Sequence, residues 1–132
     1  MAKKLHETIP EYIEAAPPGG QLQLRQLHAL LQSIAPEARQ VINWNTAFFI
    51  ERQFLFAFSA HEAHLEFNTT AESIEPFHNG LSKYEITETG VVKISYAEPL
   101  PEKLIRKIAE HRMQRVRERD DALFMKVLGR SS

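Results

Sequence analysis

The spacing of the apolar residues changes twice along this chain, and this change restricts the folds that the chain can adopt. From residue 21 the apolar positions recur at helical spacing: Leu24, Leu27, Leu30, Leu31 and Ile34. Between residues 47 and 67 the period falls to two, as in half-buried strands. After Pro101 the helical spacing returns, at Leu104, Ile105, Ile108 and Val116. Helices that flank a block of strands favour an α+β fold over an alternating parallel fold.

The middle block predicts about five antiparallel strands. Residues 47–50, 54–58 and 64–67 predict three consecutive strands, and residues 84–86 and 91–95 predict two more around Gly90. Phe54, Phe56 and Phe58 alternate with other residues, so we expect all three to face the leucine helix. Leu55 is then expected on the opposite face.

The two ends of the chain carry their own signals. Residues 8–16 predict a short helix with Thr8 as its N-cap, which the sequence Pro17-Pro18-Gly19-Gly20 stops. The far end resumes an apolar stripe at Leu123, Phe124, Val127 and Leu128. Either the last helix breaks near residues 119–121 and folds back, or it stays unbroken and offers the stripe to a partner. We favour self-association into a symmetric dimer, with another protein as the alternative partner.

Composition narrows the biological setting. The 132 residues hold no linker that would divide them, so we expect one domain over residues 1–132. The absence of cysteine excludes disulfides and thiolate zinc sites and favours the cytoplasm. The formal charge of −1 gives no general attraction for nucleic acid. The sequence has neither a signal peptide nor an apolar run of the ~20 residues that a membrane span needs.

Several segments resemble a known family. They are residues 8–13, the leucine helix, residues 42–49 (Ile-Asn-Trp-Asn-Thr-Ala-Phe-Phe), residues 58–65 (Phe-Ser-Ala-His-Glu-Ala-His-Leu) and residues 99–105. In this order they resemble the small bacterial YdhG-like family of domains of unknown function. The resemblance covers about residues 8–116 and leaves residues 117–132 as a helical extension. It implies a curved antiparallel sheet packed by helices on one face. One branch of the family is described as a frataxin-like intracellular iron chaperone.

The chain departs from the family pattern at two places. Members commonly have Gly and then Pro after the aromatic residue, where this chain has Asn45 and Ala47. Asn tolerates the left-handed conformation that Gly supplies, so we expect the turn to survive. Members commonly carry Lys before the strand histidine, where this chain has Glu62. This exchange reverses a charge at the most polar part of the sheet.

Two groups of residues are candidate metal ligands. His61, Glu62, His64 and Glu66 form the densest group, and imidazole with carboxylate suits iron or zinc. On a strand His64 and Glu66 point the same way, whereas His61 falls in a turn, so a joint site depends on the loop. Glu7, Glu11 and Glu14 form an acidic ridge on the first helix, which would bind iron weakly in an iron-chaperone protein. The alternative interpretation of the first group is that its members are ordinary polar side chains on the exposed face of the sheet. The alternative for the second group is that acidic residues stabilise the N-terminal end of a helix without binding a ligand.

The other candidate sites have weaker signatures. Trp44, Asn45 and Tyr84 would surround the mouth of a ligand pocket if the phenylalanines lined a cavity. Ser59, His61 and Glu62 have the residue types of a hydrolase triad but no nucleophile elbow. The basic residues of the last helix are interspersed with acids, which indicates a solvated, salt-bridged surface.

We therefore expect a small cytoplasmic binding or interaction protein without chemistry or a cofactor of its own. The first alternative is an iron chaperone that uses the acidic ridge or the histidine-bearing hairpin. The second is a small-ligand carrier or enzyme with a pocket near Trp44.

Overall fold

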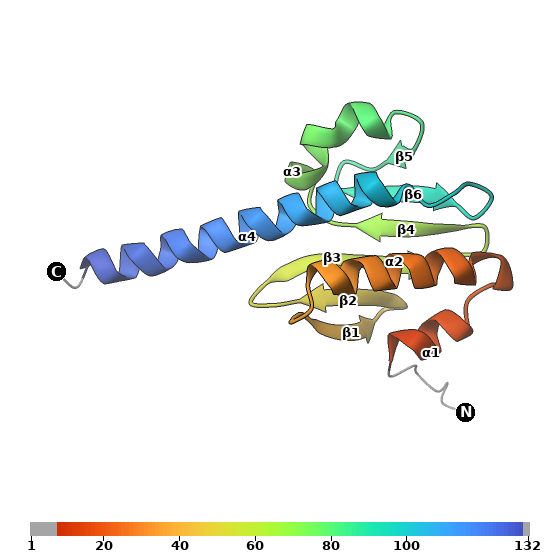
Figure 1. Cartoon of the computed structure of the whole chain (residues 1–132), viewed down its shortest axis with the longest axis horizontal. Helices are drawn as coiled ribbons and strands as arrows, with labels where there is room; N and C mark the ends of the chain where they lie inside the picture. Colours follow the sequence, from red (N-terminus) through yellow and green to blue (C-terminus); the bar gives the residue numbers. More distant parts are fainter. Residues whose placement is uncertain (1–7, 131–132) are drawn as a thin grey trace.

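Antiparallel strands form one curved, open sheet, and helices pack on one of its faces (Figure 1). The computed structural model describes the backbone of residues 8–130 and the side chains of residues 8–120. The strands are β1 (Arg39–Asn43), β2 (Thr46–Ile50), β3 (Phe54–Ala60), β4 (His64–Asn68), β5 (Glu85–Ile86) and β6 (Val91–Ser95). They lie in the order β1-β2-β3-β4-β6-β5, and each neighbouring pair is antiparallel. The predicted α+β class is confirmed.

The first, second and last helices follow the predicted helical segments, and a one-turn helix after β4 is additional. They are α1 (Ile9–Glu14), α2 (Gln21–Ile34), α3 (Ala71–Ile74) and α4 (Glu102–Arg130), with 3₁₀ turns η1 (Pro18–Gly20) and η2 (Glu75–Leu81). Thr8 caps α1 as predicted: its hydroxyl accepts from the Glu11 N–H, and the Glu11 carboxylate accepts from the Thr8 N–H, each at 3.3 Å. This reciprocal pair is a capping box, which holds the first turn of a helix too short to be stable alone.

The sheet has one strand more than the sequence predicted. β1 was missed because the segment Arg-Gln-Val-Ile-Asn does not alternate cleanly between polar and apolar residues. Its register with β2 comes from the two-residue turn between them, where Asn43 pairs with Thr46 and Arg39 pairs with Ile50. β1 is therefore a half-exposed edge strand that hairpin pairing creates, and its own hydrophobic pattern gives little sign of it.

An irregular register in β3 corrects the prediction for the phenylalanines. Phe49 pairs with Phe56 but Ile50 pairs with Phe54, so Leu55 is an extra residue in β3. Leu55, Phe56 and Phe58 are fully buried in the core. Phe54 is only half-buried, lies outside the core cluster, and has its ring 6.1 Å from that of Phe48. The expected positions of Phe54 and Leu55 were therefore wrong, because a β-bulge shifts the alternation by one residue.

A buried arginine on α4 accompanies the bulge. Arg112 is 3% exposed and donates hydrogen bonds to the carbonyl oxygens of Leu55 and Phe54. The Thr69 hydroxyl donates to the same Leu55 oxygen at 3.2 Å. Burial is the main cause that lowers the pKa of Arg112. A bulge leaves the strand ladder locally irregular, and Arg112 supplies hydrogen-bond donors to its carbonyls.

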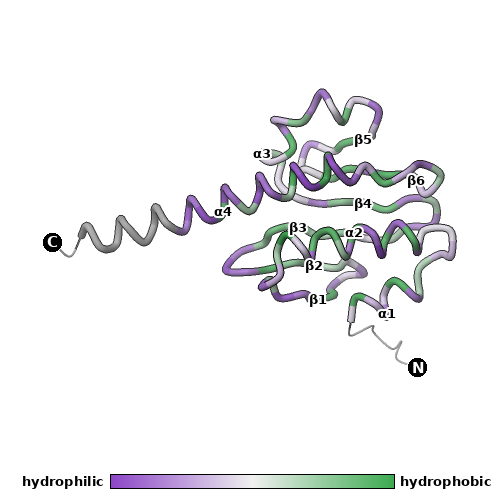
Figure 2. The backbone as a smooth tube through the Cα atoms, in the orientation of Figure 1, coloured by the Kyte–Doolittle hydropathy of each residue, from purple (hydrophilic) through white to green (hydrophobic). Residues whose placement is uncertain are grey.

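Apolar residues concentrate where the sheet meets α2 and α4. Figure 2 shows hydrophobic stretches along the central strands and a mostly hydrophilic α4 where this helix leaves the sheet. Leu24, Leu27 and Leu31 of α2 are fully buried, as their spacing predicted. Among the described residues, none of the helices combines the length and hydropathy of a membrane-spanning segment.

Candidate metal centre

Two turns and the end of β6 lie together at one end of the sheet. The turn Trp44–Asn45 joins β1 to β2, and residues 61–63 join β3 to β4. Successive antiparallel strands turn at alternate ends, so these two turns share an end. His64 pairs with Ser95, which brings Tyr96 to the same end. We call this region, made of Trp44, Asn45, residues 61–64 and Tyr96, the histidine end of the sheet.

His61, His64 and Glu66 converge at the histidine end. The two imidazole rings stack with centroids 4.7 Å apart and planes 10° apart. One carboxylate oxygen of Glu66 lies 3.5 Å from Nε2 of His61, and the other lies 3.3 Å from Nε2 of His64. The turn thus places His61 close enough to His64 and Glu66 for a joint site. The ligand atoms of the three residues all lie within 4.8 Å of one another.

The two separations that involve Glu66 are close to what a metal ion requires of its ligands. Two donor atoms that each lie about 2.1 Å from one ion are about 3.0–3.4 Å apart at octahedral or tetrahedral angles. The contacts of Glu66 with the two rings, at 3.5 and 3.3 Å, fall close to this range. Two imidazoles and one carboxylate suit zinc and ferrous iron. The three side chains keep 38%, 31% and 21% of their surface exposed, so an ion could enter and further ligands could reach it.

A buried tyrosine, Tyr12, and a partly buried one, Tyr96, hold the histidine turn in place. The Tyr12 hydroxyl accepts from the Ala60 N–H at 2.8 Å and donates to the Asn45 carbonyl at 2.7 Å. The Tyr96 hydroxyl donates to the His61 carbonyl at 2.8 Å, and its backbone N–H donates to the Ala63 carbonyl at 3.1 Å. The backbone of the turn is therefore fixed from both sides, which limits how far His61 can move away from His64.

The Tyr96 ring needs a glycine beneath it. A Cβ atom at Gly20 would lie 2.3 Å from the ring of Tyr96, closer than any real contact. Gly20 therefore allows η1 to approach the ring that supports the histidine turn. Sequence reasoning missed Tyr12, Tyr96 and Gly20, since each acts on residues far from it in the chain. The one available signal was that Tyr12 lies in the first segment of the family resemblance.

The site lacks the outer support of a tight metal centre. Within the described part of the chain, no group hydrogen-bonds to Nδ1 of His61 or His64. Metal-binding histidines usually donate from their second nitrogen to a carboxylate or carbonyl, and loss of that partner costs about 10–100-fold in affinity. The arrangement is therefore suited to weak, reversible binding.

The serine beside the histidine turn does not complete a catalytic triad. Ser59 Oγ lies 2.9 Å from Nε2 of His61. Glu66 contacts the same nitrogen, whereas a triad needs the nucleophile and the carboxylate on opposite nitrogens of the base. Ser59 is also only 5% exposed. Glu62, the acid considered for such a triad, is exposed and does not join the cluster.

The acidic ridge on α1 is only partly visible. Glu7 lies outside the described residues. The Glu11 carboxylate accepts the capping hydrogen bond from Thr8, which gives it a structural task. Glu14 is exposed on the last turn of α1. The described part of the ridge thus offers one carboxylate engaged in a cap and one in solvent.

The three residues proposed for a ligand pocket do not meet. Trp44 and Asn45 follow edge strand β1, whereas Tyr84 precedes β5 at the opposite edge of the sheet. A shallow cavity of about 150 Å³ lies beside Asn45, between Tyr12 and Ala60. This volume is smaller than the ~300–1,000 Å³ of typical small-molecule sites.

The turn itself is unusual. Trp44 and Asn45 both have positive φ, 50° and 58°, as a type I′ hairpin turn requires. Asn45 therefore adopts the left-handed conformation, as expected for the residue that replaces the family's Gly. Trp44 is 83% exposed in a conformation that bulky residues rarely adopt.

Ion pairs engage Arg106, Arg115 and Arg119 of the basic helix α4. Glu72 of α3 accepts from Arg115 at 3.0 Å and from Arg119 at 2.6 Å, and Arg106 lies 3.8 Å from Glu110. The hydrogen bond from Arg115 is the main cause that lowers the pKa of Glu72. These exposed pairs tie α3 to α4 and make this part of the helix a salt-bridged surface.

The sheet order and the one-sided helices define a class: small α+β proteins built on an open antiparallel sheet. A solved structure of this class is YdhG of Bacillus subtilis, from the DUF1801 family. It matches with a TM-score of 0.69 at 23% identity, over 77% of this chain and 85% of that one. The chain therefore has the YdhG-like fold, as the resemblance implied.

A second solved structure is more distant. It is an uncharacterised conserved protein from Lactobacillus casei, with a TM-score of 0.49 and 19% identity over 82% of this chain and 91% of that one. No family model and no curated protein matches the chain. The descriptions of both structures name no ligand and no reaction.

Proposed function

We propose that this chain is a small cytoplasmic binding protein without catalytic chemistry of its own. Its ligand is a divalent transition-metal ion, ferrous iron or zinc, held weakly and reversibly by His61, His64 and Glu66. The observation that carries the proposal is the position of Glu66, whose two carboxylate oxygens lie 3.5 Å from Nε2 of His61 and 3.3 Å from Nε2 of His64. Absence of cysteine from the sequence supports the cytoplasm.

The contacts at the site can also be explained by hydrogen bonds alone, without a metal ion. Without a metal, Nε2 of His64 can carry a proton and donate to Glu66, and Nε2 of His61 can carry a proton and donate to Ser59 Oγ, because a neutral imidazole has one N–H. A metal ion would replace both protons. Binding then depends on whether the gain from coordination exceeds the loss of these hydrogen bonds.

The histidine end is a better metal site than the acidic ridge. It offers two nitrogen ligands, which first-row ions such as zinc and ferrous iron prefer to carboxylates alone. Its backbone is fixed by Tyr12 and Tyr96. On the ridge, binding would compete with the capping role of Glu11. The histidine turn therefore supports the iron-chaperone function better than the acidic ridge does.

Titration calorimetry of the purified chain with zinc, and with ferrous iron under anaerobic conditions, tests the proposal. We expect one ion per chain with a dissociation constant above about 1 µM, since the shell is incomplete and lacks outer support. His64→Ala and Glu66→Gln should each weaken binding at least about tenfold, because each removes one of three ligands.

Glu62→Gln is the matched control, since it removes a neighbouring carboxylate that lies outside the cluster. Glu14→Gln is the control for the acidic ridge. The proposal is overturned if no binding is detected at millimolar metal, or if Glu14→Gln rather than Glu66→Gln abolishes it. Submicromolar affinity lost in His64→Ala would instead show a tight site and refute the weak, reversible mode.

A further inference from the structure

Helix α4 extends beyond the sheet that it packs against (Figure 1). It runs unbroken over 29 residues, from Glu102 to Arg130, which corresponds to about 43 Å. Its first half packs on the core through Ile105, Ile108, Ala109, Met113 and Val116. The rest continues past the edge of the sheet (Figure 1). Because the helix does not break near residues 119–121, it does not fold back onto its own domain.

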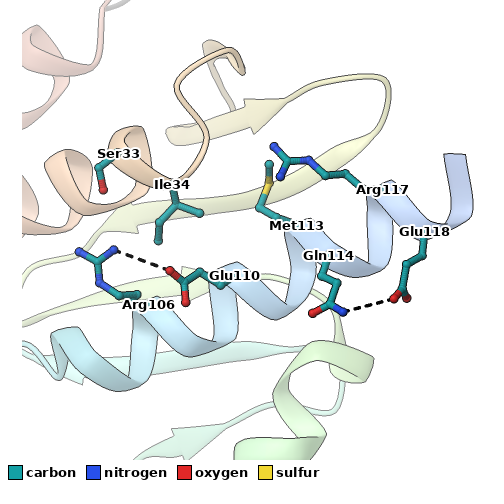
Figure 3. Close-up of a pocket in the computed structure, with 8 residues that line it drawn as sticks. All are labelled: Ser33, Ile34, Arg106, Glu110, Met113, Gln114, Arg117 and Glu118. Atoms are coloured by element: carbon teal, nitrogen blue, oxygen red, sulfur yellow. Dashed lines mark hydrogen bonds and ion pairs between the residues drawn. The ribbon is translucent and has the colours of Figure 1, made fainter. Parts of the chain in front are cut away.

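A groove of about 440 Å³ lies beside the root of this extension, between the end of α2 and α4. Figure 3 shows Ile34 and Met113 in the groove, with charged side chains along α4 around them. From the extension back toward the start of α4, the charged lining residues are Glu118, Arg117, Glu110 and Arg106. Arg106 is paired with Glu110, and Glu118 with Gln114 and Arg115. Arg117 is exposed and, within the described residues, has no ion pair.

The sequence of the extension complements this groove. Leu123, Phe124, Val127 and Leu128, whose side chains lie outside the described residues, have the spacing of one helical stripe. Acidic Asp120 and Asp121 precede the stripe, and basic Lys126 and Arg130 lie within and after it. An antiparallel helix with this sequence would set Asp121 against Arg117 and its bases near Glu110, with apolar residues between them over Ile34 and Met113. Asp120 would then lie opposite Glu118, whose carboxylate is already paired with Arg115.

We propose that the groove is occupied by the α4 extension of a second copy of this chain. The two α4 helices pair antiparallel about a two-fold axis close to Arg119, so that each extension lies in the groove of the other copy. In this register Arg117 faces Asp121 of the second copy, and Phe124 of the second copy lies one residue from the position opposite Met113. The contact is isologous, which closes the assembly at a dimer. This inference does not depend on metal binding.

The mass of the full-length chain in solution, by light scattering and sedimentation at about 20–200 µM, tests the dimer. We expect twice the 15.2 kDa of one chain at the upper concentrations. Truncation after Arg119 should leave a monomer. Arg117→Glu should raise the dissociation constant at least tenfold, because it places like charges opposite each other, and adding Asp121→Lys should restore the dimer.

Lys107→Glu is the matched control, since it makes the same charge change at an exposed position of α4 outside the groove. Thermal denaturation followed by circular dichroism shows whether each variant stays folded. A full-length chain that is monomeric at every concentration overturns the proposal and leaves the groove to another protein. A dimer that survives truncation after Arg119, or that Arg117→Glu leaves unchanged, also contradicts it.

Discussion

One hydroxyl group connects the two turns at the histidine end. Tyr12 comes from α1, yet its oxygen bridges the Asn45 carbonyl in one turn and the Ala60 N–H at the start of the other. A phenol is both donor and acceptor, so one side chain satisfies two backbone groups that strand pairing leaves open. The positions of Trp44 and of the candidate metal ligands are thus linked through one buried residue.

We predict that Tyr12→Phe lowers the free energy of unfolding by about 1–3 kcal/mol at neutral pH, because two backbone groups lose their partner. Urea denaturation measures the change. Tyr84→Phe is the control, because within the described residues the Tyr84 hydroxyl makes no hydrogen bond. A loss no larger than that of the control would show that solvent replaces the bridge.

The same residue predicts how stability depends on pH. Burial is the main cause that raises the pKa of Tyr12 above its ordinary value, and it also raises that of Tyr96. Because the pKa of each phenol is higher in the folded chain than in the unfolded chain, the two phenols contribute stability that is fully present below about pH 10. This contribution is lost as the pH rises through the folded-state pKa values. The free energy of unfolding of Tyr12→Phe should therefore fall less steeply above pH 10 than that of the parent chain. The decrease that remains should come from Tyr96.

At the level of single residues, sequence reasoning found the candidate metal ligands but not the contacts that hold them in place. Histidine and carboxylate can be recognised by type, and His64 and Glu66 share a strand face by simple alternation. The convergence of His61 depends on a turn whose shape Tyr12 and Tyr96 fix from 48 and 35 residues away. A single sequence contains no local signal for such contacts.

Among the elements, β3 shows why a hydrophobic pattern can be correct in type and wrong in register. The alternation predicted a strand, and a strand is present. One extra residue at Leu55 then reverses the positions of Leu55 and Phe54, and Arg112 of α4 binds the carbonyls of both residues. Bulges are set by pairing with the neighbouring strand, which the sequence of β3 alone does not contain.

This corrected register gives a stability series. Phe56→Ala and Phe58→Ala should each lower the free energy of unfolding by about 3–5 kcal/mol, because both rings are fully buried. Phe54→Ala should cost clearly less, about 1–2 kcal/mol, since its ring is half-buried and outside the core cluster. Chemical denaturation distinguishes the cases. Equal losses for all three changes would support the unbulged register.

At the scale of the whole molecule, the two candidate surfaces lie in different parts of the fold. The turns at the histidine end carry the candidate metal ligands, and the groove beside α4 lies between the end of α2 and residues 106–118 of α4. The α+β class and the one-sided helices were predictable from the change of hydrophobic period. The edge strand β1 was not, because it is held by pairing with β2 and buries little of its own surface.

The central claim is that His61, His64 and Glu66 bind one metal ion together. Crystals of the chain grown with zinc, with diffraction recorded on both sides of the zinc absorption edge, test it directly. We predict one anomalous peak about 2.0–2.2 Å from Nε2 of each histidine and from an oxygen of Glu66. A zinc-loaded crystal with no peak there, or with its strongest peak at Glu11 and Glu14, would contradict the account.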